Sequence, residues 1–97
     1  MEKRSFFLKL VPCRPTFAQD MAPDERAIMM QHVAYWKGFL DEGKVLVYGP
    51  VMDPNAVYGM GIVLTEDEEE VKALIAGDPA GQINTYEYYP MRAVMKG

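Results

Sequence analysis

The chain has few of the residues that most directly build catalytic or metal centres. Its 97 residues include one cysteine, Cys13, and one histidine, His32. A lone cysteine cannot form a disulfide within the chain, which is typical of proteins from a reducing compartment, so we expect a cytoplasmic protein. One histidine and one cysteine without an ordered carboxylate cluster do not make a ligand set, so we predict no metal and no cofactor. Cys13 has no base beside it and is interpreted as a loop thiol rather than a nucleophile.

Clustered basic charge and long apolar runs are also missing. The net charge is -4 and the ten Lys and Arg residues are scattered, which argues against a nucleic-acid partner. No stretch approaches the ~20 apolar residues that span a bilayer, so we expect no membrane partner. Residues 1–13 superficially imitate a signal peptide, but Lys9 interrupts the apolar run and no small-residue cleavage site follows. We therefore expect a first strand there, within a single domain over residues 1–97.

Hydrophobic periodicity and turn residues predict two helices and four strands. Pro23 at a first helical position, acidic residues after it and Gly43 at the far end indicate a helix over 23–42. Thr65 and Glu68 match a capping box for a second helix that ends at Gly77. The predicted strands are 5–11, 44–52, 57–64 and 85–95, with 12–22 as a loop.

The resulting order, β-α-β-β-α-β, predicts an α+β, ferredoxin-like fold with both helices on one face of an antiparallel sheet. The other face would be open, yet the strands are apolar on both sides. In the second strand Val45, Val47 and Val51 would share one side, opposite Leu46 and Tyr48. We expect a homodimer that packs sheet against sheet. The alternative is that loop 12–22 folds over the open face.

His32 lies on a helical stripe with Ile28, Met29, Trp36 and Phe39, so its side chain should face the sheet. A buried imidazole needs hydrogen-bond partners, and the residue could be either a satisfied core histidine or a working one. The glycines at 59 and 61 fall on one face of the third strand. They indicate either close helix packing or a small ligand cavity.

Two stretches together resemble the YCII-related (YciI-like) family. "HVAYWKGFLDEGKVLVYGPVMD" contains a helix histidine, an acidic-Gly-Lys turn, an aliphatic strand and a Gly-Pro pair. "LIAGDPAGQINTYEYYPMRAV" contains an Asp-Pro after the second helix and a proline in the final strand. The likeness covers roughly residues 23 to 95, although "AGQINTY" is shorter and more polar than the family pattern. The resemblance implies a ferredoxin-like fold and a dimeric α+β barrel.

The resemblance also implies a pocket with a His-Asp pair. Carried onto this chain, the pair would be His32 and Asp78, with Gly49 and Pro50 shaping the pocket wall. Trp36, on the same helical stripe as His32, is a further predicted ligand contact. From the sequence alone, Asp53 is an alternative partner for the histidine.

Such a pair could transfer protons near neutral pH, because a carboxylate would fix the imidazole tautomer and stabilise its charged form. Relatives implied by the resemblance include a lactone dehalogenase, and the wider barrel group includes muconolactone isomerases. We therefore predict cofactor-free isomerisation or elimination on a small organic acid or lactone. The alternative is a non-catalytic dimeric module that binds a small metabolite.

Overall fold

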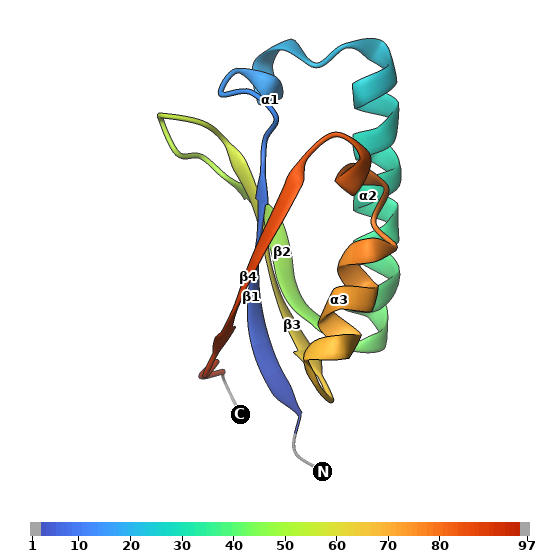
Figure 1. Ribbon diagram of the computed structural model, residues 1–97, viewed down its shortest axis with the longest axis vertical. Coiled ribbons are helices and arrows are strands. Elements are labelled where there is room, and N and C mark those ends of the chain that lie inside the picture. Colours follow the sequence, from blue (N-terminus) through green and yellow to red (C-terminus); the bar gives the residue numbers. More distant parts are fainter. Residues whose placement is uncertain (1–2, 96–97) are drawn as a thin grey trace.

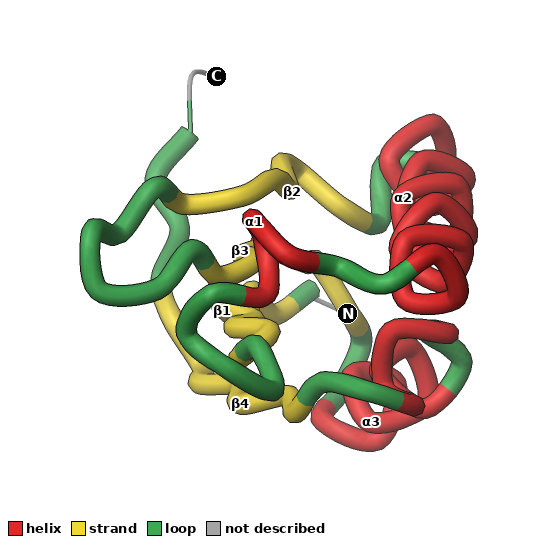
Figure 2. Tube along the Cα trace, turned by 90° about the horizontal axis from the view of Figure 1, so that it is seen from above, coloured by secondary structure: helices red, strands yellow, loops and turns green. Residues whose placement is uncertain are grey.

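The computed structural model of the chain describes residues 3–95, and Figure 1 shows their arrangement. Four strands form one antiparallel sheet in the order β2-β3-β1-β4. Helices α2 and α3 both lie on one face of this sheet (Figures 1 and 2). The expected ferredoxin-like α+β fold is confirmed. The elements are β1 (Arg4–Val11), α1 (Phe17–Asp20), α2 (Pro23–Glu42), β2 (Val45–Val51), β3 (Tyr58–Thr65), α3 (Glu68–Ala76), the 3-10 helix η1 (Pro79–Gln82) and β4 (Thr85–Met91).

Helix α2 has the predicted bounds because both ends carry the expected signals. Pro23 is its first residue, and the backbone N–H of Ala22 donates to the Glu25 carboxylate at 2.8 Å. At the other end Gly43 adopts a φ of 84°, a left-handed conformation that L side chains rarely take. The helix therefore ends where the glycine lets the chain turn back toward β2.

The capping box predicted at Thr65 is wrong. Thr65 is the last residue of β3 and is almost fully buried, with its hydroxyl donating to the carbonyl of Asp67 at 3.1 Å. The cap is Asp67, whose carboxylate accepts from the Glu70 backbone N–H at 2.9 Å. Sheet pairing holds Thr65 in the strand opposite Arg4, so the helix starts at the next residue that can cap it.

The remaining element ends differ modestly from the predictions. Strand β4 stops at Met91 instead of continuing to residue 95, and loop 12–22 contains the short helix α1. Pro90, which in a strand indicates either an edge or a bulge, lies on the edge strand β4, whose pairing partner is β1. A residue without an N–H is tolerated on a strand with one free edge.

The helix-facing side of the sheet holds the core. Phe6, Leu8 and Val63 from the central strands are buried against Trp36 of α2. In β2 the pairing register shifts between Val45 and Val47. Val45 is therefore buried in the core, whereas 48% of Val47 is exposed. The expectation that these two valines share a side is wrong, because the irregularity adds a residue between them.

The opposite face of the sheet has no cover from the described part of the chain. Alternation places Phe7, Met60 and Ile62 on it, beside the exposed Val47 and Tyr89. Loop 12–22 does not fold over this face. Its residues Phe17 and Met21 instead line a cavity on the helix side, at the end where α1 lies in Figure 1. The sheet-to-sheet dimer stays a prediction.

Candidate functional site

His32 and Asp78 come together across the interface between α2 and η1. Nδ1 of His32 lies 2.7 Å from Oδ2 of Asp78, although 46 residues separate them in the sequence. Only 14% of the imidazole is exposed, and the Asp78 side chain is fully buried. The inward direction expected for His32 is therefore what the structure shows.

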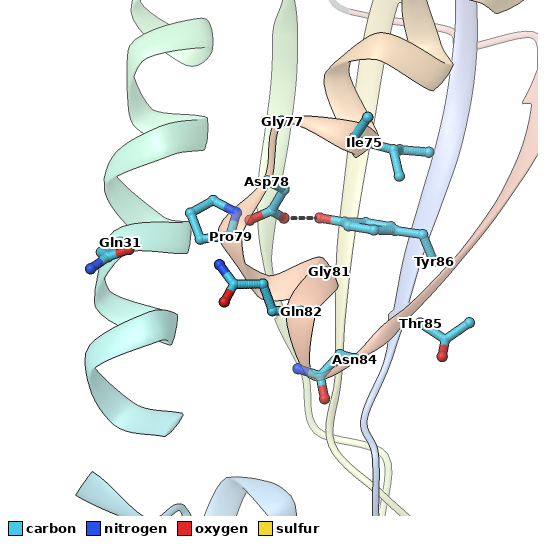
Figure 3. A pocket seen from close by; sticks show the side chains of 11 residues that line it. Gln31, Ile75, Gly77, Asp78, Pro79, Gly81, Gln82, Asn84, Thr85 and Tyr86 are labelled. Carbon is cyan, nitrogen blue, oxygen red and sulfur yellow. Dashed lines mark hydrogen bonds between the residues drawn. The ribbon is translucent and has the colours of Figure 1, made fainter. Parts of the chain in front are cut away.

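The Asp78 carboxylate is held by four donors. It caps η1, because its Oδ1 accepts from the Ala80 backbone N–H at 2.9 Å. Its Oδ2 accepts from His32, from the indole N–H of Trp36 at 2.8 Å and from the hydroxyl of Tyr86. Figure 3 shows the Tyr86 hydroxyl pointing at this oxygen. A buried carboxylate with this many donors has a fixed orientation.

These contacts decide the charge of the carboxylate. Burial acts to raise the pKa of Asp78, but hydrogen bonds from His32, Tyr86, the Ala80 backbone and Trp36 outweigh it, and the net shift is downward. Burial, together with the hydrogen bond to Asp78 and its negative charge, raises the pKa of Tyr86 well above its usual range. At neutral pH Asp78 is thus ionised, and Tyr86 is a neutral donor.

The ionised carboxylate also fixes the tautomer of His32. An ionised carboxylate only accepts hydrogen bonds, so the Nδ1 atom facing it carries the proton. In the neutral imidazole the lone pair is then on Nε2, the other ring nitrogen. His32 lines a cavity between α2 and the sheet, so a basic nitrogen is available on that side of the dyad.

That cavity has a volume of about 620 Å³, within the range of small-molecule sites. Gly59 and Gly61 of β3 contribute to its wall, on the same side of the sheet as the buried Val63. Of the two interpretations of these glycines, the structure therefore favours the cavity. A Cβ added at Gly61 would lie 3.6 Å from Cβ of Tyr48, an ordinary contact, so the missing side chain leaves room.

Loop 12–22 closes one end of the cavity. Phe17 of α1 is buried and Met21 follows it along the wall. Arg14 fastens this loop, because its guanidinium donates to both Glu25 carboxylate oxygens at 2.8 and 2.9 Å and to Asp20 at 2.8 Å. Hydrogen bonding from Arg14 lowers the pKa of Glu25 to about 2. The pair therefore stays charged through the neutral range.

A second, more open hollow of about 740 Å³ lies behind the dyad and is shown in Figure 3. Gln31, Asp78 and Gln82 contribute to its wall, whereas His32 faces the other cavity. Asn84 and Tyr86 line both. The His-Asp pair thus forms part of a partition between an apolar cavity and a hollow of mixed polarity.

The other predicted site residues are placed as follows. Gly49, Pro50 and Trp36 all line the cavity beside His32. Asp53 does not approach His32, and its carboxylate accepts from the Asn55 backbone N–H in the turn between β2 and β3. The structure therefore brings Asp78, and not Asp53, to the histidine. The functional roles of these residues stay predictions.

Sequence reasoning missed Tyr86 and Asn84. The alternation of β4 could have indicated Tyr86, because it points inward like Tyr88, two residues along. Nothing in the sequence indicated that its hydroxyl meets Asp78, since that depends on how η1 packs. Asn84 is buried, and its side-chain oxygen accepts from the Cys13 backbone N–H at 3.0 Å.

Residues 3–95 contain no group of three or more His, Cys, Asp or Glu side chains placed to hold a metal ion. Within the same residues, no helix has the length and apolar character needed to cross a bilayer.

Fold and site together are those of a small α+β protein with a histidine-aspartate pair at an apolar cavity. The family model of the YCII-related domain matches residues 6–94. The chain belongs to the YCII-related family. It has no significant match among curated proteins.

Proposed function

We propose that the protein is a cofactor-independent enzyme that moves protons on a small carbonyl compound, an organic acid or a lactone. The observation that carries this proposal is the 2.7 Å contact between His32 Nδ1 and Asp78 Oδ2 beside a cavity that His32 lines. A base oriented by a buried carboxylate is the arrangement that general acid-base catalysis requires.

The step follows from the tautomer. The Nε2 lone pair takes a proton from the carbon next to the carbonyl, and the electrons of that C–H bond form the C=C bond of an enolate. The imidazolium is stabilised by Asp78 through Nδ1–H. Isomerisation is completed when Nε2–H returns its proton to another carbon of the same compound. Elimination is completed when the enolate electrons expel a leaving group and the imidazolium loses its proton to water.

Trp36 and Tyr86 would act as positioning residues in this scheme. Both donate to the Asp78 oxygen that faces His32, so they hold the carboxylate in place while the imidazole changes charge. Neither needs to touch the substrate to do so. The cavity has few polar groups, and in such surroundings the Asp78 carboxylate stabilises the charged imidazole of His32 more strongly than it would in water.

Hydrogen-deuterium exchange at the reacting carbon tests the proposal without knowledge of the natural substrate. Small lactones and keto acids would be incubated with the protein in D₂O, and loss of the C–H signal next to the carbonyl followed by proton NMR. We expect exchange that saturates with substrate and is lost in His32→Ala. Lys37→Ala is the matched control, because Lys37 lies on the exposed face of the same helix. Exchange by His32→Ala at the wild-type rate would contradict the proposal.

A non-catalytic module that binds a small metabolite is the second candidate, and one observation favours it. Trp36, Tyr48, Tyr86 and Asn84 line the cavity, but their side chains already hydrogen-bond within the chain. They are therefore poorly placed to stabilise an enolate oxygen. Saturable binding without any exchange would support this candidate.

The same proposal includes a cytoplasmic homodimer. The lone cysteine supports a reducing compartment. The open sheet face supports pairing, because it presents Phe7, Met60 and Ile62 with the exposed Val47. Two such faces would cover each other in a symmetric pair.

A further inference from the structure

The cavity beside His32 is lined almost entirely by hydrocarbon. Leucine, valine and methionine side chains from the sheet and α2 make most of its wall, together with aromatic rings such as Phe17 and Trp36. No Lys, Arg, Asp or Glu side chain from residues 3–95 lines it. A ligand that enters it loses water on most of its surface and gains few polar contacts in exchange.

Most of the polar side chains in the wall are already engaged. The Tyr48 hydroxyl donates to the Val33 carbonyl at 3.2 Å, and Trp36 and Tyr86 donate to Asp78. His32 uses Nδ1 for Asp78, which leaves Nε2 for a ligand. A ligand hydroxyl or an acidic C–H group can therefore donate to Nε2 of the imidazole, while the rest of the ligand contacts carbon.

The cations on β1 and in loop 12–22, two segments that line the cavity, are held elsewhere. Lys9 lies between the inward-facing Leu8 and Leu10 on β1, so it projects from the opposite face, where its ammonium is 4.7 Å from the centre of the Tyr58 ring. Arg14 is occupied by Glu25 and Asp20. The buried carboxylate of Asp78 lies directly behind His32, Trp36 and Tyr86, which line the cavity. A carboxylate ligand would lose its water without gaining a permanent cation, and burying an unpaired charge is unfavourable.

From this lining we infer that the ligand of the cavity is an uncharged, mostly hydrocarbon compound with a single polar end directed at His32, and not a carboxylate. The inference rests on the proposed function, since it specifies the substrate class of the same site. Of the substrates in that proposal, it favours neutral lactones or ketones over organic acids, which are charged at neutral pH.

A neutral lactone and its own ring-opened acid form a matched pair of probes. Phthalide is an uncharged bicyclic lactone, and 2-(hydroxymethyl)benzoate is the same skeleton after addition of hydroxide. The carbonyl carbon of phthalide is bonded to an aromatic carbon that carries no hydrogen. The proposed proton abstraction therefore cannot occur, and binding is measured without turnover. Titration calorimetry at neutral pH, with the fluorescence of the single Trp36 as a second readout, compares the two. We expect phthalide to bind at least about tenfold more tightly, a free-energy difference of about 1.4 kcal/mol.

Two variants on β3 show whether binding occurs in this cavity. Gly61→Val adds atoms to the wall, and it should weaken phthalide binding at least about tenfold by filling the space that the glycine leaves. Ile62→Val, on the opposite face of the same strand, should leave binding unchanged. Circular dichroism of both variants checks that they fold. If Gly61→Val does not fold, Gly61→Ala is the milder substitution, because its Cβ meets only ordinary contacts.

The outcomes separate this inference from the proposed function. Preference for phthalide, lost on filling the cavity, supports the inference even if no compound exchanges its protons. Equal or tighter binding of the carboxylate overturns it, as does binding of neither probe, whether or not His32 catalyses exchange. Phthalide binding that Gly61→Val leaves intact also overturns it, since the ligand would then lie elsewhere.

Discussion

The side-chain oxygen of Asp78 that accepts from the His32 imidazole also accepts from the indole of Trp36, one helical turn beyond His32. One carboxylate thus fixes two residues of α2 from the same point. Because Asp78 also caps η1, the same side chain links the segment that follows α3 to α2. The geometry of the site and the packing of two elements therefore depend on the same group.

Asp78→Asn should disturb the tautomer of His32. In the wild-type protein the carboxylate holds the proton on Nδ1, and an amide can meet that nitrogen with either its oxygen or its NH₂ group. We expect the neutral imidazole of the variant to populate both tautomers. The nitrogen chemical shifts of the imidazole report this directly, since the chain has one histidine. A variant whose Nδ1 stays fully protonated would show that the carboxylate does not select the tautomer.

The same substitution should change how stability depends on acid pH. The folded-state pKa of Asp78 lies below its ordinary value of 3.8, so its ionisation stabilises the fold above that pH, and this contribution is lost as pH falls through the folded-state pKa. The advantage of wild type over Asp78→Asn should therefore shrink as pH drops below 3.8. Denaturant unfolding of both proteins at several pH values measures it. A constant difference down to about pH 2 would contradict a depressed pKa.

Replacement of Trp36 separates its packing from its hydrogen bond. Trp36→Ala leaves a large cavity in the core and should lower the free energy of unfolding by about 3–5 kcal/mol. Trp36→Phe keeps most of the apolar volume but removes the N–H that donates to Asp78, so it should cost less, about 1.5–3 kcal/mol. Chemical denaturation followed by circular dichroism gives both values. A Trp36→Ala protein as stable as wild type would mean that the stripe of α2 does not pack on the sheet.

The open sheet face should make the protein a dimer in solution. Light scattering at micromolar concentration should give twice the 11.0 kDa mass of the chain. Val47→Lys places a charge on that face, on the edge strand β2, and should shift the mass toward the monomer. Lys37→Ala on the outer face of α2 is the control and should stay dimeric. A wild-type protein of 11.0 kDa under these conditions would remove the sheet-to-sheet barrel.

The sequence determined the element order and most element positions because those signals are local. Pro23 and Gly43 mark the ends of α2 whatever packs on it, and apolar periodicity alone turns His32 toward the sheet. Prediction failed where a local signal competed with strand pairing: Thr65 matches a capping residue but is held in β3. The register shift in β2 is not marked by any residue pattern in the sequence, so it was also missed.

Only the tertiary structure decided the site. The choice of Asp78 over Asp53, and the arrival of Tyr86 at the same oxygen, depend on the packing of η1 and β4 against α2, contacts between residues far apart in the chain. The side of the sheet that Gly59 and Gly61 face was likewise set by which strand face received the helices. A sequence fixes what each short segment can form, but a hydrogen bond between distant residues needs coordinates accurate to a fraction of an ångström, and those arise only when the segments pack together.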